Sequence, residues 1–100
     1  MLQLYNEKPV LISMKQNKSV FSVKFCNVKM KLKMCQFKLF HNYLMHTSEN
    51  LNSDSHKVDL LLVRDNLNVT VSLDDFLELS NGVQSVMTKE FGFSRYRHQT

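Results

Sequence analysis

Residues 27–34 read Asn-Val-Lys-Met-Lys-Leu-Lys-Met, in which apolar residues alternate with lysines. Because successive side chains of a β-strand point to opposite faces, this run predicts a strand with one apolar face and one basic face. A helix would spread the lysines around its circumference. The apolar face carries Val28, Met30, Leu32 and Met34, and the basic face carries Lys29, Lys31 and Lys33.

Size and composition indicate one small globular domain over residues 1–100. The chain is 43% hydrophobic, which suffices for a single core. No apolar run approaches the roughly 20 residues of a membrane span, and residues 1–7 lack the features of a signal peptide. We therefore expect a cytoplasmic protein without membrane contact, whose Cys26 and Cys35 are free thiols packed as small apolar groups.

Charge is distributed unevenly. Residues 1–50 hold eight lysines and two glutamates, whereas residues 51–100 hold five lysines or arginines and seven acidic residues. A basic half of this kind can attract a polyanion, or it can attract the acidic half within the fold.

The alternation of apolar residues predicts a first hairpin from residues 10–14 and 19–25, with a four-residue loop at Lys15–Lys18. This register pairs Met14 with Ser19, Ile12 with Phe21 and Val10 with Val23. The apolar phase then flips after Phe25, which either a β-bulge or a two-residue turn at Cys26–Asn27 would explain. We favour the turn, which pairs Phe25 with Val28, Val23 with Met30, Phe21 with Leu32 and Lys24 with Lys29.

Residues 35–45 fit two structures. Cys35–Leu39 alternates like a strand, while Phe37, Phe40 and Leu44 recur at helical spacing. We favour a strand through Phe40 with a short irregular end. The polar residues 46–56 predict a loop.

A second hairpin is predicted where Lys57–Arg64 and Leu67–Leu73 flank Asp65–Asn66, two residues that suit a tight turn. This register pairs Leu62 with Val69, Leu60 with Val71 and Val58 with Leu73.

A helix is predicted over about residues 73–90. Ser72 can cap its first turn, and Gly92 would end it. Asn81–Gly82 should weaken or bend it. Its apolar stripe is Phe76, Leu79, Val83, Val86 and Met87. We expect the basic and aromatic tail, within residues 91–100, to be loosely held.

Together these elements predict an α+β fold: one antiparallel sheet of five or six strands, with a single C-terminal helix packed on one face. We detect no internal repeat and no linker that would divide the chain.

The first candidate site is a nucleic-acid-binding surface. A basic stripe on one sheet face suits phosphate groups, although a solvated face is the simpler interpretation. The aromatic residues Phe21 and Phe25 point to the opposite, core side. The stripe comprises Lys24, Lys29, Lys31 and Lys33, extended by Arg95 and Arg97.

The second candidate site is a protein interface. Some apolar residues fall outside the predicted core face, and the aromatic tail adds to them. Coverage by a neighbouring segment is the alternative. These residues are Leu11, Val20, Leu61, Val63, Phe93 and Tyr96.

Metal binding and catalysis receive little support. The four residues Cys26, Cys35, His41 and His46 lack the close pairs typical of zinc ligands. No residue pattern supplies a nucleophile with its base and an oxyanion hole, and two glycines do not make a phosphate-binding loop. We therefore expect no enzyme, no cofactor and no bound metal. The sequence favours a small binding protein that acts through protein–protein contact, as a homodimer or accessory subunit; the alternative is a nucleic-acid-binding protein.

Overall fold

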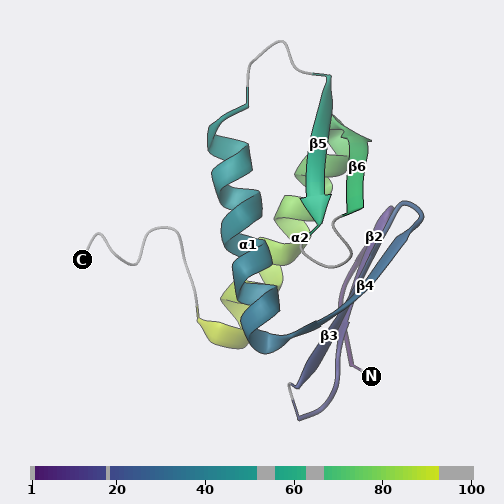
Figure 1. Ribbon diagram of the computed structural model, residues 1–100. Helices are drawn as coiled ribbons and strands as arrows, with labels where there is room; N and C mark the ends of the chain where they lie inside the picture. Colours follow the sequence, from purple (N-terminus) through teal and green to yellow (C-terminus); the bar gives the residue numbers. More distant parts are fainter. Residues whose placement is uncertain (1, 18, 52–55, 63–66, 93–100) are drawn as a thin grey trace.

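The fold is α+β, with six strands and two helices (Figure 1). This computed structural model describes residues 2–17, 19–51, 56–62 and 67–92. Strands β1–β4 form a four-stranded antiparallel sheet in the order of the chain, while β5 and β6 form a separate two-stranded sheet. The elements are β1 (Leu2–Glu7), β2 (Val10–Met14), β3 (Val20–Phe25), β4 (Val28–Lys33), α1 (Met34–Glu49), β5 (Lys57–Leu62), β6 (Leu67–Ser72) and α2 (Leu73–Phe91).

Two features of the predicted architecture are wrong in detail. The six strands lie in two sheets rather than one, and a second helix, α1, occupies the segment for which we favoured a strand through Phe40. The helical spacing decides this segment, because Phe37, Phe40 and Leu44 are all buried while Cys35 and Leu39 are exposed. A strand would have pointed Phe37 and Phe40 to opposite faces.

The turn between β3 and β4 is as predicted. Phe25 lies opposite Val28, Val23 opposite Met30 and Phe21 opposite Leu32, with Cys26 and Asn27 as the two turn residues. Cys26 has a φ of 52°, in the left-handed region that the first position of such a turn requires. The pairing of β2 with β3 differs from the predicted register by two residues, because Ile12 lies opposite Val23 instead of Phe21. A shift of two keeps every side chain on its predicted face.

The β5–β6 hairpin shows the same kind of difference. Leu60 lies opposite Val69 instead of Val71. The residues predicted to form the turn, Asp65 and Asn66, lie outside the described part of the chain. The apolar face is unchanged, since the shift is again two residues.

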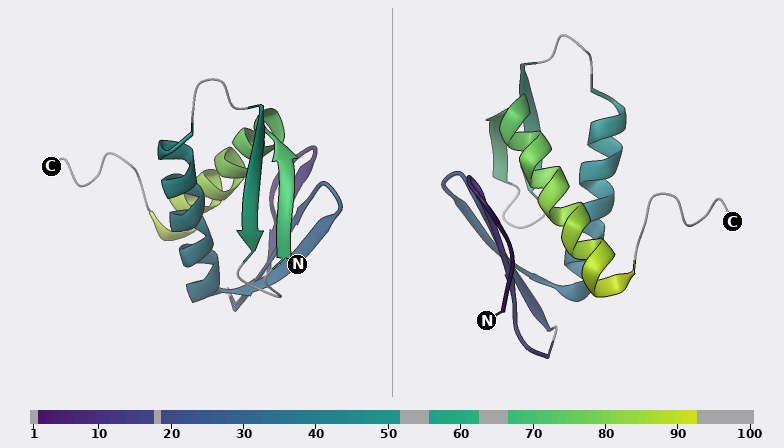
Figure 2. Two further views of the ribbon diagram at one scale, coloured as in Figure 1. Left: turned by 45° about the horizontal axis from the view of Figure 1, so that its top comes forward. Right: turned by 180° about the vertical axis from the view of Figure 1, so that it is seen from behind.

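Both helices cover the same face of the four-stranded sheet, as Figures 1 and 2 show. Helix α2 packs on β1 and β2, and α1 packs on β3 and β4. The β5–β6 hairpin lies against α2 and adds its own apolar face to the same core. The largest fully buried side chains include Phe21, Phe25, Phe37, Phe76, Ile12, Leu44, Leu60 and Leu79.

Helix α2 begins and ends where the sequence predicts. The hydroxyl of Ser72 accepts a hydrogen bond from the Asp75 N–H at 3.1 Å, and Gly92 adopts a φ of 65° after the last turn. The helix continues without a break through Asn81 and Gly82, the pair that was predicted to weaken or bend it. Gly82 gives the Tyr5 ring room, because a Cβ built there would lie 2.8 Å from two ring carbons of Tyr5.

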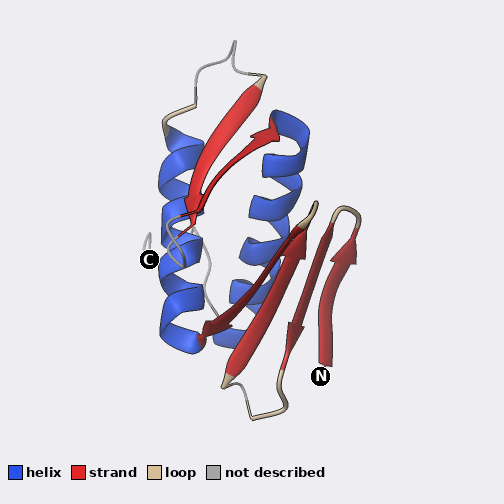
Figure 3. Cartoon of the chain, turned by 45° about the vertical axis from the view of Figure 1, so that its right-hand side comes forward, coloured by secondary structure: helices blue, strands red, loops and turns tan. Residues whose placement is uncertain are grey.

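The chain contains an internal structural repeat that the sequence pattern did not reveal. Two antiparallel strands followed directly by a helix occur twice, as β3–β4–α1 and as β5–β6–α2 (Figure 3). Strand β4 begins at Val28 and β6 at Leu67, 39 positions later, and α1 and α2 begin at Met34 and Leu73, again 39 apart. The first copy differs in that β1 and β2 extend its hairpin into a larger sheet.

Candidate interaction surface

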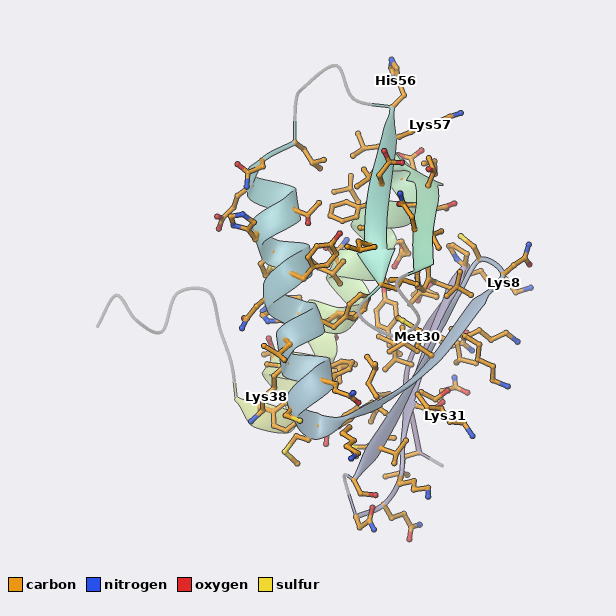
Figure 4. All side chains as sticks on the ribbon, in the orientation of Figure 1. Lys8, Met30, Lys31, Lys38, His56 and Lys57 are labelled. Carbon is orange, nitrogen blue, oxygen red and sulfur yellow. The ribbon has the colours of Figure 1, made fainter. Side chains whose placement is uncertain are left out.

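The face of the four-stranded sheet turned away from both helices is here called the outer face. Alternation along β3 and β4 directs one set of side chains into the core and the other onto this face. Met30 and Leu32 are buried, whereas Lys29, Lys31 and Lys33 are exposed. In Figure 4 Lys31 points away from the helices.

The strand registers arrange the outer face in rows that run across the sheet. Lys24 lies between Leu11 on β2 and Lys29 on β4. Ser22 lies between Ser13 and Lys31, so small hydroxyl side chains occupy the middle of the sheet. On β2 to β4 and the residue that follows β2, the residues of this face are Leu11, Ser13, Lys15, Val20, Ser22, Lys24, Lys29, Lys31 and Lys33, and β1 adds Gln3 and Asn6, which lie opposite Ser13 and Leu11.

The third row brings together residues from both candidate sites. Val20 lies opposite Lys33, and its carbonyl accepts a hydrogen bond from the Lys15 N–H at 3.0 Å. Leu11 and Val20 are partly buried, even though no described element covers this face. The long aliphatic stems of neighbouring lysines can shield such residues while the ammonium groups stay in water.

No described acidic residue lies on the outer face. A group of carboxylates belongs to the first turns of α2, where Asp74 and Asp75 follow the cap and Glu78 accepts a hydrogen bond from the Tyr5 hydroxyl. These carboxylates are part of the helix layer, on the other side of the sheet. Lys24 and Lys29 lie directly opposite each other, which is mildly unfavourable for folding and concentrates positive charge.

The remaining predicted site residues do not join this surface. Leu61 is 55% exposed, but it lies on β5 in the other sheet. Its N–H donates a hydrogen bond of 2.8 Å to the Tyr43 hydroxyl of α1. The other residues assigned to the two candidate sites, which are Val63, Phe93, Arg95, Tyr96 and Arg97, lie outside the described part of the chain.

The histidine and cysteine residues do not converge. Cys26 lies in the β3–β4 turn, Cys35 is exposed in the first turn of α1, and His41 is buried between the helices. The Nε2 atom of His41 is 2.8 Å from Oε1 of Gln84 on α2. Within the described ranges, no three histidine, cysteine or acidic residues are grouped as metal ligands.

Cys26 has a polar contact that sequence reasoning missed. Its thiol donates a hydrogen bond to Oδ2 of Asp75 at 3.5 Å. Both cysteines are exposed, so the prediction that their thiols pack as small apolar groups is wrong. Partial burial, the charge of Asp75 and this hydrogen bond together raise the pKa of the Cys26 thiol. The two residues are 49 positions apart, so no local sequence signal could have linked them.

Lys15, Ser13 and Ser22 are also additions to the predicted site. The signal for them was present, since the alternation in residues 10–14 and 20–25 fixes their face.

In comparisons with protein-family models, curated proteins and solved structures, the chain matches none of them. In the described ranges, neither helix has the length and apolar content to cross a membrane.

Proposed function

We propose that this chain is a non-enzymatic binding protein that holds a protein partner on the outer face of its four-stranded sheet. The supporting observation is that the two helices cover only one face, while partly buried Leu11 and Val20 share the other face with exposed lysines. An antiparallel sheet can pack one face on the core and leave the other in water, so a partner can bind the outer face without disturbing the core. Homodimerisation or a role as an accessory subunit would both use it.

The test is co-purification of the tagged full chain with its natural partner, identified by mass spectrometry. A Lys29→Glu/Lys33→Glu variant should lose the partner, because it reverses charge on the proposed surface. A Lys57→Glu/Lys89→Glu variant is the matched control, since both lysines are exposed on other elements and the change in net charge is equal. Retention of the partner by the first variant would contradict the proposal.

Size-exclusion chromatography with light scattering tests the homodimer. A dimer that dissociates in the Lys29→Glu/Lys33→Glu variant, and not in the control, would identify the partner as a second copy. A monomer without any partner would count against the whole proposal.

A second candidate is nucleic-acid binding through the same lysines. The observation that favours it is the regular row of Lys29, Lys31 and Lys33 along one strand. Contacts to phosphates would weaken steeply with rising salt and would weaken again in the Lys29→Glu/Lys33→Glu variant. Absence of binding to DNA or RNA at low ionic strength would exclude this candidate.

A further inference from the structure

We infer that the outer face binds an acidic polypeptide segment with carboxylates at alternate positions. This inference rests on the proposed function and specifies the chemistry of the partner. It is carried by charge complementarity and by the spacing, side-chain type and surroundings of the lysines.

Spacing is the first argument. Side chains two residues apart on one face of a strand start about 6–7 Å apart, so Lys29, Lys31 and Lys33 leave β4 at that interval and their ammonium groups can adopt the same spacing. An extended polypeptide has the same rise, and its alternate side chains repeat at the same distance. A segment with an acidic residue at every second position, lying along β4, can therefore place one carboxylate near each lysine.

The apolar residues are the second argument. Leu11 adjoins Lys24 and Val20 adjoins Lys33, so aliphatic groups lie among the charges. The side chains of a polypeptide can pack on Leu11 and Val20 while its carboxylates reach the lysines. Ser13 and Ser22, opposite each other in the middle row, keep the centre of the face low and supply hydroxyl groups.

The absence of aromatic side chains is the third argument, and it speaks against nucleic acids. Proteins that hold single strands stack bases on exposed rings. In the described part of this sheet the phenylalanines face the core, with Phe21 0% and Phe25 1% exposed, and Tyr5 is directed to Glu78 of α2. Among the described residues of the outer face, bases would find no aromatic ring on which to stack.

The test is a titration of the ¹⁵N-labelled full chain, followed by two-dimensional NMR at low ionic strength. One probe is a synthetic peptide that alternates glutamate and threonine. The second is an oligothymidylate of equal charge, and the third is a peptide of the same composition with its glutamates in one block. We expect the alternating peptide to bind at least about tenfold more tightly than either of the others. The amide shifts should be confined to the outer face, including Leu11, Ser13, Val20 and Ser22.

The variants separate this inference from the proposed function. Lys29→Glu/Lys33→Glu should abolish the shifts, whereas Lys57→Glu/Lys89→Glu should preserve them. Equal or tighter binding of the oligothymidylate would overturn the inference in favour of nucleic acid, and equal binding of the blocked peptide would overturn the spacing argument. If the chain self-associates through this face in the absence of any probe, the partner is a second copy of the chain, and the inference of an acidic segment is overturned. The proposed function fails by a different result, namely retention of the natural partner by the charge-reversed variant.

Discussion

Cys26 adopts a left-handed backbone conformation in the turn between β3 and β4, with a φ of 52°. A residue with a side chain pays about 1 kcal/mol or more for this conformation, whereas glycine adopts it without a steric cost. We expect Cys26→Gly to be more stable than Cys26→Ala by about 1 kcal/mol, because both variants lose the thiol contact and only glycine removes the strain. Urea denaturation of the two variants measures the difference. Equal stabilities would show that the turn relaxes around either residue.

The Cys26 thiol reports on its contact with Asp75. The pKa of this thiol is raised by partial burial, by the charge of Asp75 and by their hydrogen bond, so less of the reactive thiolate is present. In a Cys35→Ser background, we expect Asp75→Asn to lower the pKa and accelerate alkylation by iodoacetamide. Asp74→Asn is the matched control, since it removes a neighbouring charge from the same helix turn. Equal acceleration by both variants would indicate a general charge effect and contradict a specific contact.

The elements differ in how far their sequences determine them. Local patterns suffice for β4, for the β3–β4 turn and for the capped start of α2 at Ser72, because each depends on neighbours in the chain. Helix α1 was missed because Cys35–Leu39 alternates like a strand, although Phe37, Phe40 and Leu44 also recur at helical spacing. Only the burial of Phe37 and Phe40 on one side settles the choice. Strand registers two residues off satisfy the same apolar pattern, so the pattern cannot distinguish them.

Helix α2 depends on Gly82 for its contact with β1. Alanine normally stabilises a helix relative to glycine by about 1 kcal/mol. Here its Cβ would lie 2.8 Å from the Tyr5 ring and 3.3 Å from Val10. We expect Gly82→Ala to lower the free energy of unfolding by about 1–2 kcal/mol, because the ring must move.

A double-mutant cycle isolates this packing effect. In a Tyr5→Ala background the crowding by the ring is absent, so Gly82→Ala should be neutral or stabilising. Chemical denaturation of the four proteins gives the coupling energy. A destabilisation of equal size in both backgrounds would contradict the role assigned to the ring.

The two helices have unequal N-terminal caps. Ser72 accepts a hydrogen bond from Asp75 at the start of α2, whereas Lys33, at the equivalent position of α1, has no acceptor atom in its side chain. Only Gln36 contributes, because its Oε1 accepts from the Lys33 N–H at 2.8 Å. We expect Lys33→Ser to raise the free energy of unfolding by about 0.5–1 kcal/mol. Lys33→Ala is the control for charge removal, and thermal denaturation should rank it below the serine variant.

At the scale of the whole molecule, the hydrogen bond between Tyr5 and Glu78 joins the edge strand to the helix layer and should make folding sensitive to alkali. Burial, the hydrogen bond to Glu78 and the charges of Glu78 and Glu7 raise the pKa of Tyr5 to about 12. Since the folded state favours the neutral phenol, the stabilisation is complete below about pH 10 and is lost as the pH rises to about 12.

We therefore expect the free energy of unfolding to fall over this window in the unsubstituted chain and to fall less in Tyr5→Phe. Urea denaturation at a series of alkaline pH values measures both, with Tyr43→Phe as the control for loss of another tyrosine. Parallel curves for the chain and for Tyr5→Phe would contradict the assignment.

The candidate site was predictable in part. Alternation was sufficient to place Lys29, Lys31 and Lys33 on one face, because a strand has a period of two. The same alternation places Leu11 and Val20 on this face, and the predicted β3–β4 register sets Val20 opposite Lys33. The neighbourhood of Leu11 and Lys24 was not predictable, because it depends on the β2–β3 register, which differs from the predicted one by two residues.

The two hairpin–helix units look alike, but they pack on different parts of the molecule. Helix α2 of the second unit covers β1 and β2, the strands that precede the first unit. A product shortened after α1 would leave Val10, Ile12 and Tyr5 open to water, and half of the gene would therefore not encode a smaller version of the fold. Although the halves look like duplicates, each completes the other, and the shortest soluble fragment should extend through the end of α2.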